Sequence, residues 1–319
     1  MQLVFPRLSW DLIDTDQIFQ KQSRLWKSLA FRFRAGRAVA AVNRDVLIRL
    51  SDRRYKVTWV DKGVLLYPET VRRLRECSEK LIYYTPDTSF LHNQSRFFER
   101  TIQLYDLVVT TKSPELPMFL KRIPEQKLLL TTQSFDSRLH RPRHAFAEKK
   151  RAAVLIGLCE PSRTRCVEAL LERGIPVNVG GQGWTDFARR YRNHPAFQFV
   201  GDRVFGEQYA EMLSQAWVGL GMLTRRFQEL HTTRTFEIPA CGTVLATPDN
   251  KEIRSIFNAD EALFFSSTED LGDQIQSLFA DPERAECVAA AGMRRVHFGC
   301  YDNDGLVKDV FARLGPEFD

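Results

Sequence analysis

The chain has 319 residues, of which 44% are apolar, so its length suits two domains and its composition is ordinary for a globular protein. No apolar run reaches the roughly 18 residues of a membrane span, and the N-terminus lacks the basic region and long apolar core of a signal peptide. The net charge is a modest +6, which fits a solvated surface as well as anionic partners such as nucleotides, lipid headgroups or glycans. The six cysteines form no C-x-x-C pair, so we expect free thiols in a reducing cytoplasm and no zinc or redox motif.

Strand and helix patterns alternate through the first part of the chain. The predicted strands are 2–5, 57–60, 81–84, 107–110 and 128–130, and the predicted helical segments are 17–54, 68–80, 93–104 and one that begins near Pro114. This alternation predicts a parallel sheet covered on both faces, with ligands at the carboxyl ends of the strands. Those ends hold Lys62-Gly63, residues 87–92 and Thr111-Lys112.

The segment 17–54 is basic as well as helical in pattern. Its basic residues include Lys21, Arg24, Lys27, Arg32, Arg34, Arg37 and Arg44. The pattern is typical of an exposed helical face above an apolar core stripe. The interleaved Trp26, Phe31 and Phe33 leave a second interpretation open, which is contact with an anionic membrane or with nucleic acid.

A polar, basic and proline-containing stretch at 134–150 predicts a linker between two domains. A second alternating series follows it, which predicts a second parallel sheet. Its predicted strands are 153–156, 176–179, 197–200, 217–222 and 244–246. Its predicted helices are one from Arg163 or Arg165 to 173, then 206–215, 268–279, 283–295 and 301–314. The loops 157–162 and 180–184 are not GxGxxG fingerprints, so we expect no dinucleotide cofactor.

The stretch Glu229–Ala246, ELHTTRTFEIPACGTVLA, carries the densest chemistry of the chain. It predicts a loop, a short helix that begins near Thr235, a tight turn and a buried strand. The start of that helix offers backbone N–H groups to an anion, and Arg234 and the neighbouring threonine hydroxyls add donors. Glu237 accepts hydrogen bonds from ribose or sugar hydroxyls in this interpretation. The alternative is that these residues only cap a helix.

The run from His231 to Gly242, HTTRTFEIPACG, resembles the C-terminal signature of the CgeB-type (spore-maturation-protein-like) glycosyltransferases. These are relatives of the large family-four nucleotide-sugar transferases, whose paired-glutamate motif is similar to Glu229 and Glu237. The resemblance implies an α/β protein of the GT-B fold, in which two Rossmann-like domains face a central cleft. It implies an acceptor-side domain at 1–140, a donor-binding domain at 141–319, and a C-terminal helix that returns to the first domain.

The donor site that we expect combines this signature with the first two strand ends of the second domain, which resemble those of the family. The diphosphate leaving group gains negative charge during transfer, so the site needs positive charge to stabilise it. The planar guanidinium of an arginine can donate two hydrogen bonds to phosphate oxygens. The alternative for Arg163 and for Arg165 is that each is only a surface charge on a helix. The expected donor-binding residues are Gly157, Arg163, Arg165, Gly183, Trp184, His231, Thr232, Arg234, Thr235 and Glu237.

Three residues are candidates for catalysis. Asp87 and His92 follow a predicted strand of the first domain, where a base can activate an acceptor hydroxyl. The alternatives are a turn or cap for Asp87 and a capping or surface role for His92. Glu229 is the third candidate, through the resemblance alone. No Asp-x-Asp pair follows a strand, so we expect no metal.

The sequence therefore predicts a glycosyltransferase (a hexosyltransferase-like EC 2.4 enzyme). Its donor is a UDP- or GDP-linked sugar, it needs no further cofactor, and its acceptor is a glycan or a lipid-linked molecule. We expect it in the cytoplasm, with peripheral contact to an anionic inner-membrane surface as a further partner and no nucleic acid. The alternatives are a non-catalytic nucleotide-sugar or glycan-binding protein on the same scaffold, and an epimerase or phosphorylase.

Overall fold

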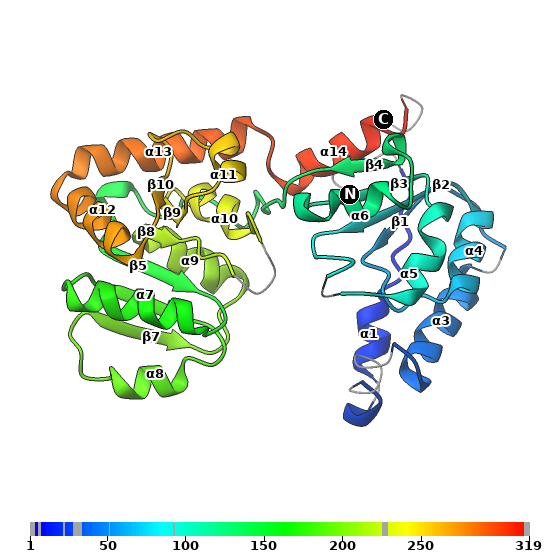
Figure 1. The fold of residues 1–319 in the computed structure, drawn as a ribbon, viewed down its shortest axis with the longest axis horizontal. Coiled ribbons are helices and arrows are strands. Elements are labelled where there is room, and N and C mark those ends of the chain that lie inside the picture. Colours follow the sequence, from blue (N-terminus) through cyan, green and yellow to red (C-terminus); the bar gives the residue numbers. More distant parts are fainter. Residues whose placement is uncertain are drawn as a thin grey trace. The chain divides into compact units, whose positions relative to one another are not determined.

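The structure is a computed structural model that describes residues 4–5, 8–21, 23–27, 34–50, 52–91, 93–224 and 229–315. The chain divides into two compact units (Figure 1). The first unit is Met1–Thr132 with Val307–Asp319, and the second is Gln133–Leu306. Each unit has its own parallel sheet, so the predicted α/β class with two Rossmann-like domains is confirmed.

The first unit contains a four-stranded sheet in the order β1-β2-β3-β4. Its strands are β1 (Tyr55–Asp61), β2 (Ser78–Thr85), β3 (Leu107–Thr110) and β4 (Leu128–Leu130), and its helices are α1 (Thr15–Gln20), α3 (Arg37–Leu50), α4 (Pro68–Cys77), α5 (Arg96–Thr101) and α6 (Leu116–Leu120). α14 (Asn303–Ala312) begins in the second unit and continues into the first. In the described part of the chain, none of the helices combines the length and apolar character that crossing a membrane takes.

Alternate residues of β2 point to opposite faces of this sheet. Leu81 and Tyr83 pack in one core cluster with Val42 of α3, whereas Ile82 packs in another with Val310 of α14. Helices therefore cover both faces, which explains why these strands are continuous apolar runs.

The second unit contains a six-stranded sheet in the order β10-β9-β8-β5-β6-β7. Its strands are β5 (Lys150–Ile156), β6 (Val177–Gly180), β7 (Phe197–Gly201), β8 (Ala216–Leu220), β9 (Val244–Pro248) and β10 (Leu263–Phe265), and its helices are α7 (Pro161–Glu172), α8 (Thr185–Arg190), α9 (Gly206–Gln215), α10 (Arg234–Ala240), α11 (Lys251–Ile256), α12 (Thr268–Ala280) and α13 (Pro282–Phe298). Along β5, Leu155 joins one core cluster and Val154 the other, so this sheet is also buried on both faces.

Several predicted boundaries differ from the structure. Val4 and Phe5 lie in a turn and not in a strand. The helix predicted over 68–80 ends at Cys77, because Ser78 already pairs with Tyr55 in the sheet. The helix predicted over 17–54 is divided into α1, a helical turn at 24–27 and α3. Two short helices, α8 and α11, were not predicted, since six residues are too few to show a clear helical period.

The segment 134–150, predicted as a linker, belongs to the second unit and is partly buried in it. Phe135 is 1% exposed and forms an isolated parallel bridge with Asp302. His140 and Lys149 are also buried, and β5 begins at Lys150. The division of the chain lies between Thr132 and Gln133, ahead of the predicted boundary at 140/141.

A buried carboxylate holds the loop that follows β2. Glu115 is 0% exposed and lies on the 3-10 turn Ser113–Glu115. Its two oxygens accept hydrogen bonds from the backbone N–H groups of Ser89 (2.7 Å), Phe90 (2.8 Å) and Leu91 (3.0 Å). Three donors to one charged group balance the cost of burying it. This carboxylate therefore orders the loop that begins at Asp87.

We expect Glu115→Gln to lower the free energy of unfolding by about 1.5–3 kcal/mol, because the amide loses the charge and one acceptor oxygen while three buried N–H groups remain. Urea unfolding of the full chain measures this loss. Glu69→Gln is the control, because Glu69 is an exposed first-turn residue of α4. Equal unfolding midpoints for the two variants would contradict the role of Glu115.

Candidate functional site

The order of the second sheet reverses between β5 and β8. β5 leads on to β6 and β7 on one side, whereas β8 leads on to β9 and β10 on the other. The connections that follow β5 and β8 therefore run to opposite sides, and we call the place where they diverge, at the carboxyl ends of these strands, the crevice. This is the usual place for a ligand in an open parallel sheet.

Arg163 lies in this crevice and joins its two sides. Its guanidinium donates from Nη1 to the Leu158 carbonyl (2.8 Å), which follows β5, and from Nη2 to the Met222 carbonyl (3.4 Å), which follows β8. Gly157 makes room for it, since a Cβ there would lie 2.9 Å from Nη1. Arg163 is 5% exposed, and its Nε is buried without a hydrogen-bond partner.

The charge of Arg163 is only partly balanced. Burial is the main cause that lowers its pKa, and the positive charge of Arg234 is the second. The carboxylates of Glu160 and Glu229 act in the opposite direction. The Glu160 carboxylate is 4.0 Å from Nε, at the limit of an ion pair. The guanidinium groups of Arg163 and Arg234 repel one another at the end of a parallel sheet. A bound anion would reduce this repulsion, so the pair favours an anion-binding site.

The start of α10 corrects the expectation that its backbone N–H groups are offered to an anion. The N–H groups of Thr235, Phe236 and Glu237 already donate to the carbonyls of Thr232 and Thr233. In the described part of the chain, the Oγ1 of Thr232 is one of few buried polar atoms without a hydrogen-bond partner, as is Arg163 Nε. Buried polar atoms are nearly always paired, so both atoms indicate a ligand or ordered water at this place.

Glu237 is oriented by two residues that are distant in sequence. The Tyr209 hydroxyl donates to Oε2 (2.6 Å), and His140 Nε2 lies 3.9 Å from Oε1. Burial, followed by the charge of Glu237, raises the pKa of Tyr209 well above its ordinary value, so the hydroxyl keeps its proton. Burial lowers the pKa of His140, although Glu237 opposes this shift. The Glu237 side chain is 15% exposed, which leaves it accessible to a ligand.

The far end of α10 is held by Lys149. Its Nζ donates to the carbonyls of Cys241 (3.1 Å) and Gly242 (2.6 Å) and to Thr243 Oγ1 (3.1 Å). A cation at the C-terminal end of a helix is favoured by the helix dipole and satisfies carbonyls that have no partner within the helix. Lys149 is 7% exposed, and burial lowers its pKa to about 8.

The structure gives other predicted donor residues a structural role. Trp184 is 0% exposed in the core, and its indole N–H donates to the Gly157 carbonyl (2.8 Å), so it supports the loop after β5 and is not open to a ligand. Gly183, at φ +88°, allows the turn before it. Thr235 is also fully buried, and its Oγ1 accepts from the Thr232 N–H (3.1 Å).

His231 is occupied on both ring nitrogens. The Gln133 N–H donates to Nε2 (2.9 Å), so Nδ1 carries the proton and donates to the Glu252 carboxylate. At 3% exposure it ties the start of α10 to α11 and to the segment after β4. This arrangement corrects the expectation of direct donor contact by His231.

Arg163 and Arg165 are separated by the rotation of α7. Arg165 is exposed, whereas Arg163 is on the face that also buries Cys166 and Val167. The sequence indicates this difference, because Arg163 precedes Cys166 and Val167 by three and four positions, and residues at that spacing share a face of a helix. Tyr209, His140 and Lys149 carried no comparable signal, since they lie far from the motif in the sequence.

In the first unit, Asp87 lies just after β2 and pairs with Lys62 (Oδ2–Nζ 2.8 Å), which follows β1. The pair is partly exposed, with Asp87 at 41% and Lys62 at 49%. The carboxyl ends of adjacent strands are where ligands usually bind in a parallel sheet. His92 lies outside the described residues.

Residues 163–307 match the model of a family described as glycosyl transferase-like. The chain carries a glycosyl transferase-like segment in a GT-B fold. The matched segment includes Arg163, Glu229, Arg234 and Glu237, and the CgeB-type resemblance remains an expectation.

Solved structures share the GT-B fold over most of the chain. Sucrose-phosphate synthase from Thermosynechococcus elongatus is 15% identical with a TM-score of 0.60, and the match covers 90% of this chain and 79% of that one. HepE of Anabaena, in complex with UDP and glucose, is 13% identical with a TM-score of 0.60, over 87% and 81%. Trehalose 6-phosphate synthase from Burkholderia multivorans is 14% identical with a TM-score of 0.58, over 94% and 82%. No curated protein matches the chain.

The lowered pKa of Lys149 predicts a pH dependence of stability. The folded chain releases this proton near pH 8, and the unfolded chain near 10.4. Between these values the unfolded state binds more protons, so the free energy of unfolding rises with pH, by about 3 kcal/mol in total. Below pH 8 both states are protonated, and this contribution no longer changes.

Urea unfolding of Lys149→Met and of the wild type across this pH range measures the effect. We expect Lys149→Met to lack the rise, and Lys150→Met, which changes an exposed neighbour, to keep it. A rise of the same size in all three proteins would show that other groups cause it.

Proposed function

We propose that the chain is a glycosyltransferase that moves a sugar from a nucleoside diphosphate sugar to a hydroxyl of a glycan or lipid-linked acceptor, without a metal. The donor diphosphate binds at the crevice between β5 and β8. The glycosyl transferase-like segment and the GT-B fold support this proposal. HepE, with the same fold, is described in complex with UDP and with UDP-glucose, so UDP is the first nucleotide to test.

One observation carries the proposal: Arg163 is buried, its Nε has no hydrogen-bond partner, and the positive charge of Arg234 acts on it. A diphosphate supplies the negative charge and the oxygen acceptors that this pair needs. During transfer, the bond between the anomeric carbon and the diphosphate oxygen breaks, and the leaving group gains negative charge. Arg163 and Arg234 are placed to stabilise that charge.

The other residues of the site take separate roles in the proposal. Glu237, held by Tyr209, accepts hydrogen bonds from hydroxyls of the donor. Thr232 offers its unpaired hydroxyl to a phosphate oxygen. Glu229 adds negative charge near the guanidinium pair, where a cationic sugar forms in the transition state.

On the acceptor side, Asp87 is the base that we propose in the described residues. It takes the proton of the acceptor hydroxyl as that oxygen bonds to the anomeric carbon. Its ion pair with Lys62 holds the carboxylate at the ends of β1 and β2. His92 remains the alternative base.

The diphosphate seat predicts that UDP or GDP binds more tightly than the corresponding monophosphate. Arg163→Gln should weaken UDP binding by about tenfold or more, since it removes a charge-assisted hydrogen bond. Arg165→Gln is the matched control on the same helix and should bind UDP as the wild type does, because Arg165 points outward. Calorimetry measures both. Equal affinity for mono- and diphosphate, or equal loss in the two variants, would rule out this seat.

The contact between Tyr209 and Glu237 predicts an effect on affinity with little effect on folding. Tyr209→Phe keeps the ring and removes the hydroxyl, so Glu237 loses its orientation and the affinity for the nucleotide sugar should fall several-fold. Tyr191→Phe is the control, since Tyr191 donates to Glu168 away from the crevice (3.1 Å). Normal affinity in a folded Tyr209→Phe would refute the role of this bond, whereas binding with no transfer to any acceptor would favour a non-catalytic binding protein.

A further inference from the structure

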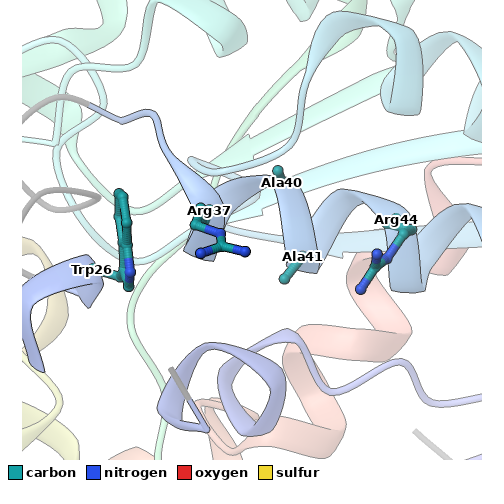
Figure 2. A pocket seen from close by; sticks show the side chains of 5 residues that line it. All are labelled: Trp26, Arg37, Ala40, Ala41 and Arg44. Carbon is teal, nitrogen blue, oxygen red and sulfur yellow. The ribbon is translucent and has the colours of Figure 1, made fainter. Parts of the chain in front are cut away.

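A cavity lies in the first unit, along one face of α3. Its volume is about 420 Å³, and its lining residues are Trp26, Arg37, Ala40, Ala41 and Arg44 (Figure 2). This volume is within the range of about 300–1,000 Å³ that small-molecule sites occupy. The cavity is far in sequence from the crevice in the second unit, and the roles proposed above do not use it.

The helical period explains the shape of this cavity. Residues 37, 40, 41 and 44 recur at helical spacing and share one face of α3. The two alanines form a low floor, and the two arginines are at its ends, about 10 Å apart along the helix axis. Figure 2 shows Trp26 at the end of the cavity beside Arg37. The Arg37 guanidinium carbon is 5.9 Å from the centroid of the Trp26 ring.

Both arginines keep their charge available. Among the described residues, no ion pair joins Arg37 or Arg44 to a carboxylate, and the adjacent Asp45 pairs instead with Arg49 (2.6 Å). Both side chains are exposed at the rim. A cavity with two cations and an aromatic wall suits a ligand that is both ring-shaped and anionic.

The position of the cavity agrees with a role on the substrate side of the first sheet. α3 leads directly into β1, so the beginning of α3 lies toward the carboxyl end of that strand. Asn43 shows this arrangement, because it donates to the Leu65 carbonyl (2.8 Å) and accepts from the Tyr67 N–H (2.7 Å), both beyond the end of β1. Arg37 lies nearer still to the start of the helix. This is the end at which parallel sheets bind ligands.

We propose that this cavity binds an anionic sugar. The sugar ring packs against Trp26 over the alanine floor, and Arg37 and Arg44 bind its phosphate or carboxylate. The inference deepens the proposed function, on which it rests, by assigning the acceptor to the class of phosphorylated or acidic sugars. The aromatic face of Trp26 would recognise the sugar ring, and the guanidinium groups of the two arginines would recognise its anionic group.

Calorimetry with glucose 6-phosphate, glucuronate and uncharged glucose tests the proposal. We expect one or both anionic sugars to bind, and glucose to bind much more weakly. Arg37→Gln with Arg44→Gln should weaken that binding about tenfold or more, and Trp26→Ala should also weaken it. Arg49→Gln is the matched control, since it removes the same charge from the same helix outside the cavity. UDP affinity should be unchanged in all these variants, so a failure of the donor site is seen separately.

Three outcomes would overturn the proposal. The first is equal binding of charged and uncharged sugars, or none. The second is anionic-sugar binding that survives in the folded double variant. The third is binding only to vesicles of phosphatidylcholine with phosphatidylglycerol, lost in the double variant. That last result would assign the arginines to a lipid surface, for which the exposed Leu47 and Ile48 on the next turn of α3 are suited.

Discussion

The burial of one positive charge organises the second unit. A guanidinium group removed from water is costly unless hydrogen bonds and opposite charge replace the lost hydration. Arg163 obtains carbonyl partners from the segments after β5 and after β8, which are adjacent only because the strand order reverses there. The positive charge of Arg234 still acts on Arg163, whose Nε has no hydrogen-bond partner, so an anionic ligand would complete the balance of charge.

α10 depends on the same principle, because each of its ends is held by a buried polar group. Lys149 binds the carbonyls at its C-terminal end, and His231 fixes the chain just before its start. Between them, Tyr209 holds Glu237 in one direction. A side chain that is already oriented loses less entropy when a ligand binds, so rigid support translates into affinity.

The first unit uses a buried negative charge in a comparable way. Glu115 gathers three backbone N–H groups and so shapes the loop that begins at Asp87. The loop carries its functional candidates at the surface, while the charge that orders it is inside. The buried charge therefore supports the loop without itself being exposed.

The sequence alone determined the class of fold and the place of the main motif. Two series of alternating apolar strands and helices predict two parallel sheets, because strands buried on both faces must be apolar throughout. The strands predicted at 107–110 and 128–130 and the helix at 206–215 have the bounds of β3, β4 and α9. The short helix after Thr233 and the buried strand after Gly242 were also predicted, since Pro239 and Gly242 are strong local signals.

Only the tertiary structure decided which side chains meet. Helical spacing shows that Arg163 and Arg165 point in different directions, but packing against the sheet decides which of them is buried. Likewise, Tyr209 and His140 approach Glu237 from separate parts of the chain. The polar atoms of the Trp184 and His231 rings form hydrogen bonds within the protein. Local sequence determines secondary structure through short-range sterics and periodicity, whereas contacts between distant segments depend on how whole elements pack, and no local pattern records that.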